Sequence, residues 1–184
     1  MRPQFQKTDE YKDHVLEINR VTRVTKGGKR MRFRTVVVIG NQKGKVGIGV
    51  AKGPDVVESI SKAKNKAKKN VFTINMDGKT IPHPIEMKYS AARIVIKPAE
   101  VGHGLMAGGA ARIVLSMAGF ADVTAKYLSR TTNKLANAMV TLEALKQLKP
   151  SKNQNGKIKV ENDNAKSKDE SDKKRSKDLT DSKL

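Results

Sequence analysis

The sequence contains no cysteine and no tryptophan, and its 184 residues include only three tyrosines and four phenylalanines. The lack of cysteine excludes disulfides, thiolate zinc sites and catalytic thiols. The scarcity of aromatic rings disfavours a surface that stacks unpaired bases. No apolar run reaches the roughly 18 residues of a membrane-spanning helix, and residues 1–5 lack the apolar core of a secretory signal. We therefore expect a soluble protein of a reducing compartment.

Positive charge is in excess, because 38 lysines and arginines outnumber 18 aspartates and glutamates and give a formal charge of +20. Residues 151–184 contribute only +3, from ten basic and seven acidic residues, so residues 1–150 carry +17. Such a charge is typical of proteins that bind a polyanion, and a merely solvated surface is the alternative. Residues 150–184 contain too few apolar side chains to offset the entropy of ordering, which predicts a disordered tail.

The basic residues are densest between Arg20 and Arg34, a stretch without any acidic residue. Residues 18–26 and 31–39 are rich in β-branched side chains, which predicts two strands. Gly27-Gly28 lies between them and predicts a tight turn, so the two strands should form a basic hairpin.

A third strand is predicted at residues 46–51, after a turn at residues 40–44. Its apolar residues alternate with Gly47, Gly49 and Ala51. One face of this strand can therefore pack a core, while the other face admits close approach of a backbone or a helix.

A helix is predicted to begin at Gly53-Pro54-Asp55, because proline fits a first turn and acidic residues suit its positive end. Its buried stripe is expected to comprise Val56, Val57, Ile60, Ala63 and Ala67. Lys62, Lys66 and Lys69 project together from the opposite side, and Lys64 lies near the apolar edge. A row of lysines on such a helix can bind the phosphates of a duplex by charge and shape, without reading bases.

The sequence of the second half predicts a further set of elements. The first are a hairpin of residues 71–76 and 79–81 around Asp77-Gly78, a strand at 93–97 and a glycine-rich loop at 102–109. Next come a helix buried through Ala111, Val114, Leu115 and Ala118 and a strand at 123–129. The last is a helix capped by Thr132 or Asn133, with Leu135, Met139, Leu142 and Leu145 facing inward. We read two small α+β domains joined near residues 74–80.

Catalysis is disfavoured by the motifs. Gly102-x-Gly104-x-x-Ala107 resembles a dinucleotide-binding loop, but four residues separate it from the end of the preceding strand, and Asp122 directly follows a helix. His14, His83 and His103 are too scattered to suggest a ligand pair, and no phosphate loop, catalytic triad or acidic metal cluster is found. We expect no enzyme, no cofactor and no metal.

Two blocks of residues resemble the bacterial small-subunit ribosomal protein five family. The first comprises Asn19-Arg20-Val21, Lys26 to Lys29, Phe33, Thr35, Val38 to Asn41, Gly44, Val46-Gly47, Gly49 and Ala51-Lys52, and the second comprises Pro98-Ala99, Gly102-x-Gly104, Ala107 to Gly109 and Arg112. The resemblance covers residues 14–148, and two separate blocks without gaps make the probability of chance agreement very small.

The resemblance implies an N-terminal domain similar to the double-stranded-RNA-binding fold and a C-terminal βαβα domain of the kind found in small-metabolite kinases. On this basis the chain divides into a flexible extension (1–13), an RNA-binding domain (14–77), a C-terminal α+β domain (78–149) and the tail (150–184). Because a shared fold does not carry activity, no kinase substrate is implied.

The resemblance also implies a function and partners. Members of this family are structural constituents of the small ribosomal subunit in the cytoplasm. They bind its ribosomal RNA, bridge its head and body, contact ribosomal proteins four and eight, lie near the path by which messenger RNA enters, and influence translational accuracy. A free double-stranded-RNA-binding protein and a remote small-molecule kinase relative remain the alternatives.

The predicted site residues fall into two groups. The RNA-binding group is Arg20, Arg23, Lys26, Gly27, Gly28, Lys29, Arg30, Lys43, Lys45, Lys52, Lys62, Lys66 and Lys69. The protein-interface group, which rests on the resemblance, is Gly102, Gly104, Gly108 and Arg112.

Overall fold

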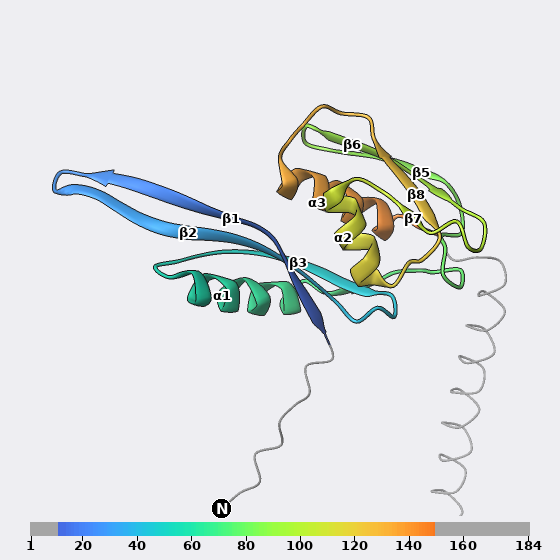
Figure 1. The fold of residues 1–184 in the computed structure, drawn as a ribbon, viewed down its shortest axis with the longest axis horizontal. Coiled ribbons are helices and arrows are strands. Elements are labelled where there is room, and N and C mark those ends of the chain that lie inside the picture. The colour runs from blue at the N-terminus through green and yellow to red at the C-terminus, as the bar shows by residue number, and fades with distance from the viewer. Residues whose placement is uncertain (1–10, 150–184) are drawn as a thin grey trace, which may run out of the picture. The chain divides into compact units, whose positions relative to one another are not determined.

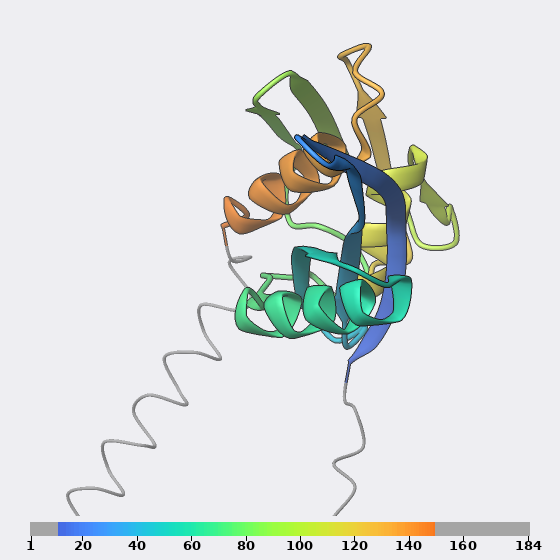
Figure 2. The ribbon, with the colours of Figure 1, turned by 90° about the vertical axis from the view of Figure 1, so that its left-hand side faces the viewer.

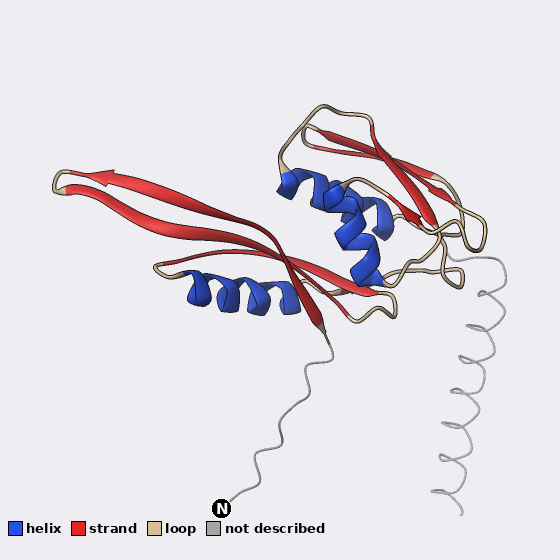
Figure 3. Cartoon of the chain, in the orientation of Figure 1, coloured by secondary structure: helices blue, strands red, loops and turns tan. Residues whose placement is uncertain are grey.

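The computed structural model describes residues 11–149. In chain order its elements are β1 (Lys12–Thr25), β2 (Gly28–Gly40), β3 (Lys45–Gly53), α1 (Val56–Lys69), β4 (Phe72–Thr73), β5 (Ile85–Tyr89), β6 (Ala92–Pro98), β7 (Leu105–Met106), α2 (Gly109–Ala118), β8 (Val123–Tyr127) and α3 (Lys134–Lys146). They form two four-stranded sheets with helices packed on each (Figures 1 and 3), which confirms the predicted two-domain α+β class.

The first sheet has the strand order β1-β2-β3-β4, and all its neighbouring strands are antiparallel. α1 lies along one face of this sheet (Figure 2). Because side chains alternate between the faces of a strand, Val37 and Ile39 of β2 pack beneath α1, whereas Val36 and Val38 pack into the core of the second half. Both faces of β2 are buried here, which explains why four apolar residues follow one another.

Glycines of β3 let α1 approach the sheet closely. A Cβ atom at Gly49 would lie 2.2 Å from the carbonyl oxygen of Ala63, and one at Gly47 would lie 2.6 Å from that of Ala67. No real side chain tolerates such distances, so only glycine permits this packing. The predicted division of β3 into a core-packing face and a helix-admitting face is confirmed.

The second sheet has the order β5-β6-β8-β7, with β7 and β8 parallel. α2 and α3 cover the face of this sheet that is turned toward the first sheet (Figure 1). The predicted inward residues of α2 are all fully buried, and Leu142 and Leu145 of α3 are buried as predicted. Asn133 is the cap of α3, since its side-chain oxygen accepts the N–H of Ala136 at 3.2 Å.

The turn between β2 and β3 holds the C-terminal end of α2. The N–H groups of Gln42 and Gly44 donate to the carbonyl oxygens of Met117 and Ala118, at 3.0 and 2.8 Å. These carbonyls belong to the last helical turn, where they find no partners within the helix. Gly119 then ends α2 with a φ of 100°, and a Cβ atom there would lie 2.2 Å from the carbonyl oxygen of Gln42. Backbone hydrogen bonds thus join the first sheet to α2.

The hairpin predicted at residues 71–81 is wrong in its strands. Only Phe72–Thr73 is a strand, and it pairs with β3 rather than with the residues after the turn. Asp77 and Thr80 form an isolated bridge around the turn. The N–H of Ile74 donates to the carbonyl oxygen of Gly44 at 2.8 Å while its side chain is buried. Tertiary contacts therefore use this segment as a connection packed on the core.

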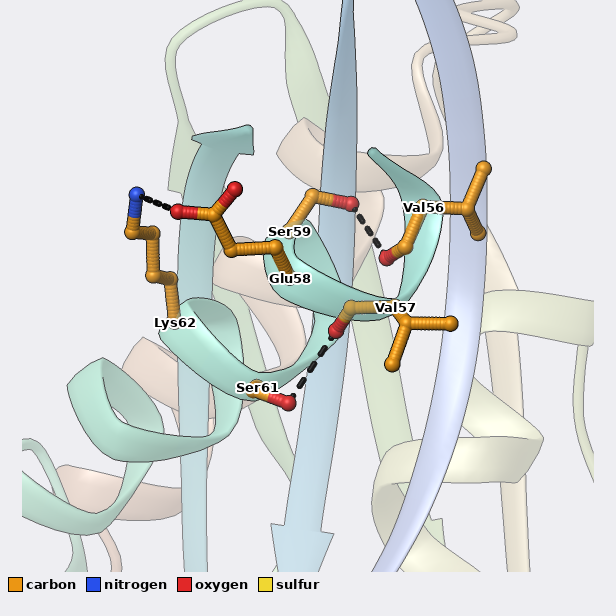
Figure 4. Close-up of polar contacts among 6 residues, drawn as sticks. All are labelled: Val56, Val57, Glu58, Ser59, Ser61 and Lys62. Carbon is orange, nitrogen blue, oxygen red and sulfur yellow. Dashed lines mark hydrogen bonds and ion pairs between the residues drawn. The ribbon is translucent and has the colours of Figure 1, made fainter. Parts of the chain in front are cut away.

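The expected buried stripe of α1 is wrong at Val57, which is 70% exposed. Ser59 is fully buried in its place. Its hydroxyl can be buried because it is hydrogen-bonded: it donates to the carbonyl oxygen of Val56 (Figure 4) and lies 2.6 Å from the hydroxyl of Thr35. The short strands β5 and β7 were not predicted from the sequence. β1 begins at Lys12, within the extension predicted for residues 1–13, and the predicted tail lies outside the described residues.

Candidate nucleic-acid interface

The far part of β1 and β2 is a two-stranded ribbon. β3 pairs with β2 only from Phe33 onward, so residues 28–32 pair with β1 alone. Figure 1 shows these strands extending beyond the rest of the first sheet. Thr25 pairs with Gly28 across a two-residue turn, and Gly28 has a φ of 121°, where glycine is favoured. The predicted basic hairpin is present, but its two-residue turn is Lys26-Gly27 and not the predicted Gly27-Gly28, because Gly28 already pairs with Thr25.

One face of the ribbon is lined with cations. The strand register places Arg23 opposite Arg30 and Arg34 opposite Lys52 of β3. Side chains two residues apart on a strand share a face, so Arg30, Arg32 and Arg34 form a row with a spacing of about 6.8 Å. We call Arg23, Arg30, Arg32, Arg34 and Lys52 the basic face. A hollow of about 490 Å³ is lined by four of them, all except Arg34.

The cations of the basic face are not paired with carboxylates in the part of the chain that the structure describes. Arg23 and Arg30 are direct cross-strand neighbours, and like charges in that arrangement destabilise a sheet. A two-stranded ribbon is itself only marginally stable in water. A polyanion would relieve the repulsion, so the arrangement suits phosphates better than solvent alone.

Arg32 and Arg34 were absent from the predicted RNA-binding residues, although the structure puts them on the basic face. The signal was in the sequence: arginine recurs at every second position from Arg30 within a predicted strand. The strand period of two places such residues on one face. The proximity of Lys52 had no comparable local signal, because it depends on the register between β2 and β3.

Other predicted RNA-binding residues lie elsewhere on the hairpin. Arg20 is opposite Phe33 and Lys29 is opposite Val24, which places both on the face that carries α1. Lys26, Gly27 and Gly28 form the exposed turn region. The structure therefore divides the hairpin residues between two faces and a tip.

The lysines of α1 differ in their pairing. Lys62 is ion-paired with Glu58 one turn earlier (Figure 4), and Lys64 is ion-paired with Asp13 at 3.0 Å. Lys66 and Lys69 are exposed, and neither forms an ion pair with another described residue. Because an exposed pair contributes at most about 1 kcal/mol, Lys62 can exchange its carboxylate for a phosphate.

Lys43 and Lys45 lie at the other end of the first sheet. The side-chain oxygen of Asn41 accepts the N–H groups of both residues, at 2.8 and 3.0 Å, and so orders their turn. The 13 residues of β2 separate this turn from the hairpin tip, a distance of about 40 Å at the usual rise per residue. The predicted RNA-binding residues thus form three groups along the first domain.

The glycine-rich loop is held by a buried carboxylate. Asp122 is only 6% exposed, and its Oδ1 accepts the N–H groups of Gly102 and Gly104 at 3.1 and 3.0 Å. Both glycines have positive φ, 91° and 81°. Asp122 therefore fixes the loop backbone. In a dinucleotide-binding loop, an acidic residue at this place would instead contact a ribose.

Gly108 and Arg112 lie beside a shallow hollow of about 400 Å³ at the start of α2. A Cβ atom at Gly108 would lie 2.9 Å from the ring of Tyr127, so Gly108 serves internal packing. Arg112 is exposed.

Burial raises the pKa of Tyr127 above its ordinary value of 10.0, with hydrogen bonds to Thr141 and to the Ala111 backbone opposing the shift.

Comparison with known proteins decides the family. A family model described as "Ribosomal protein S5, N-terminal domain" matches residues 11–75, and one described as "Ribosomal protein S5, C-terminal domain" matches residues 87–157. The chain belongs to the ribosomal protein S5 family. The chain is also 40% identical over 154 residues to the small ribosomal subunit protein uS5c of Gracilaria tenuistipitata var. liui, covering 82% of this chain and 89% of that protein.

Membership of the S5 family makes the chain a structural constituent of the small ribosomal subunit, with ribosomal RNA and ribosomal proteins as partners. Proteins of this family are structural and not enzymes, which confirms the prediction of no catalysis. The first matched range contains the ribbon and α1, and the second contains the glycine-rich loop. No helix within residues 11–149 is long and apolar enough to cross a membrane.

Proposed function

We propose that this S5-family chain binds small-subunit ribosomal RNA mainly through the basic face, with Lys66 and Lys69 as a second contact. The observation that carries the proposal is the opposed pair Arg23 and Arg30, together with Arg32, on a hairpin segment whose sequence holds no acidic residue. Each of these guanidinium groups can donate bidentately to a phosphate. Such contacts fix the position of the protein on RNA without reading its sequence.

The salt dependence of RNA binding tests this proposal. The full chain is titrated with a small-subunit RNA fragment at several salt concentrations, as the wild type and as Arg30→Gln with Arg32→Gln. If each guanidinium releases one counterion, the double variant should lower the slope of log K against log salt by about 1.4–1.8. Lys88→Gln, which removes one charge from β5, is the control. An unchanged slope in the double variant contradicts the proposal.

We further propose that the glycine-rich loop and Arg112 contact ribosomal protein four, that a second surface contacts ribosomal protein eight, and that the chain thereby bridges the head and body near the path of messenger RNA. The resemblance supports this assignment, as does a loop backbone that Asp122 holds in one conformation. A protein contact at this place would influence translational accuracy, because the subunit must close on a correct codon.

A nonsense-readthrough reporter tests the contact. Arg112→Leu should raise readthrough while subunit profiles stay normal, since the substitution removes an exposed contact without touching the core. Arg130→Leu, an exposed arginine outside the loop, is the matched control. Normal readthrough with normal assembly in the Arg112 variant would refute the interface.

We also propose that the ribosome is a bacterial one in the cytoplasm. The two motif blocks match the bacterial pattern, whereas the relative from Gracilaria is a plastid protein. Fractionation of the source cells decides between the compartments. The chain should sediment with cytoplasmic small subunits in high salt, and its recovery in a plastid fraction would overturn this part of the proposal.

A further inference from the structure

A groove opens beside the free edge of β3, away from the hairpin. β4 pairs with β3 only at Lys45 and Val46, so the following residues of β3 have no strand neighbour on this side within residues 11–149. Ile48 of β3, Asn70 after α1, Tyr89 of β5 and Met139 of α3 are among the lining residues. The groove has a volume of about 480 Å³. We call it the edge groove.

The edge groove combines an apolar floor with a polar rim. Ile48 is 5% exposed and Met139 is half-buried at the floor, whereas Tyr89 is 39% exposed. Lys66 and Asn70 also line the groove, and the amide nitrogen of Asn70 lies 3.5 Å from the carbonyl oxygen of Ile48. A nucleotide needs this set: a flat surface for the base, amides for the polar edge of the base and a cation for the phosphate.

The edge groove is continuous with the basic face. Ile48, Val50 and Lys52 alternate along β3 and therefore share one face, with Lys52 about 6.8 Å beyond Val50. Ile48 and Val50 line the groove, while Lys52 belongs to the basic face. RNA that follows the basic face toward the second half therefore reaches the groove. Among the described residues, no carboxylate lines the edge groove, so the charge favours RNA over a basic peptide segment.

We propose that the edge groove binds one unpaired nucleotide of the RNA that the basic face holds, with its base stacked on Tyr89, its polar edge at Asn70 and its phosphate near Lys66. This inference rests on the proposed RNA-binding function and adds recognition of an extruded base to it. Base recognition in RNA depends on such unstacked nucleotides, since the bases of a regular RNA helix are hard to reach. Asparagine pairs well with adenine, which makes adenosine the expected nucleotide.

Two RNA probes test the inference with the full chain. One is a duplex with a single bulged 2-aminopurine, a fluorescent adenine analogue, and the other is the same duplex without the bulge. The wild type should bind the bulged duplex about fivefold or more tightly, in line with the stacking of one base on an aromatic ring, and should quench the bulge fluorescence. Tyr89→Ala should abolish both effects, and Tyr89→Phe should keep them.

Asn70→Ala is a second variant at an exposed position, and it should weaken the preference for the bulge even if Tyr89→Ala fails to fold. Equal binding of both probes by the wild type, or a preserved preference in Asn70→Ala and Tyr89→Ala, would overturn the nucleotide site. Variants that bind both probes normally but are lost from assembled subunits would also overturn the nucleotide site, because a protein would then occupy the groove. The Arg30→Gln with Arg32→Gln variant distinguishes failure of the nucleotide site from failure of the proposed function. If the basic face binds RNA, this variant lowers the slope of log K against log salt for both probes.

Discussion

At the level of single residues, Asp122 has a structural role that the sequence around it does not indicate. Its carboxylate accepts two backbone N–H groups, and its own carbonyl oxygen accepts the hydroxyl of Thr80 at 2.7 Å. A buried carboxylate is tolerated only when hydrogen bonds satisfy it. One residue therefore joins the glycine-rich loop to the connection between the domains.

Asp122→Ala should destabilise the chain by about 1–3 kcal/mol, because two N–H groups of the loop lose the charged acceptor that holds them. Asp122→Asn keeps a carbonyl oxygen and should cost less. Urea unfolding measures the loss, and hydrogen exchange at Gly102 and Gly104 should accelerate most in the alanine variant. Asp77→Ala, at an exposed turn position, is the control, and identical exchange in all variants would contradict the role of Asp122.

Tyr127 predicts a pH dependence of stability. Burial raises the pKa of its phenol above 10.0, and its hydroxyl donates to the carbonyl oxygen of Asn137 at 3.1 Å. The folded state thus favours the protonated phenol. This contribution to stability is fully present below the unfolded pKa of about 10 and is lost as the pH rises through the folded value. Between about pH 9 and 11, Tyr127→Phe should lose less stability than the wild type in urea unfolding; parallel curves would disprove this.

At the level of elements, the contact of α1 with β3 depends on the absence of side chains. Ala63 and Ala67 of the helix are fully buried against this strand, and Gly47 and Gly49 provide the space for them. The helix is therefore placed close to the sheet, with its lysines on the outer side. This packing sets the position of Lys66 at the rim of the edge groove.

Gly49→Ala should destabilise the chain by about 3 kcal/mol, the upper end of the range for overpacking, because its Cβ would lie 2.2 Å from a helix carbonyl oxygen. Thermal unfolding followed by circular dichroism measures the effect. Gly109→Ala is the matched control, since a Cβ there meets no atom within 4 Å, and it should leave the melting temperature unchanged or slightly higher. Equal melting temperatures for the two variants would show that α1 can move away without cost.

At the level of the whole molecule, the two sheets share one apolar core. Val38 of the first sheet, Leu115 of α2 and Ile94 of the second sheet belong to the same buried cluster. The division of the chain into domains of residues 14–77 and 78–149 therefore stays a prediction. The S5 family models match residues 11–75 and 87–157.

Removal of residues 150–184 should leave the melting temperature nearly unchanged. The described chain is secured up to its last residue, since the carbonyl oxygen of Leu148 accepts the side-chain amide of Asn75 at 2.9 Å and the N–H of Lys149 donates to His83 at 3.1 Å. The removed segment has few apolar residues to contribute. Differential scanning calorimetry of the full chain and the truncated chain tests this. A decrease of several degrees would show that the segment contributes to the fold.

Short-range patterns in the sequence were enough to predict most of the elements and the family. Runs of β-branched residues predicted β2, alternation with glycine predicted β3 and helical spacing predicted α2 and α3. The acid-free run located the basic hairpin. These patterns depend only on neighbours a few residues apart. The two motif blocks were specific enough to indicate the S5 family from the residues alone. The strands predicted at residues 71–76 and 79–81 do not pair with each other, because Phe72–Thr73 pairs with β3 instead, although the turn between them does form.

Which of these residues meet depends on the tertiary structure. Strand register places Arg23 beside Arg30 and brings Lys52 to the same face. Helix packing brings Lys66, Tyr89 and Met139, from separate parts of the chain, to one groove. Asp122 reaches the glycine-rich loop across 18 residues and more. Each of these contacts is long-range, so its free energy depends on how whole elements pack, and no pattern within a short stretch of sequence contains that information.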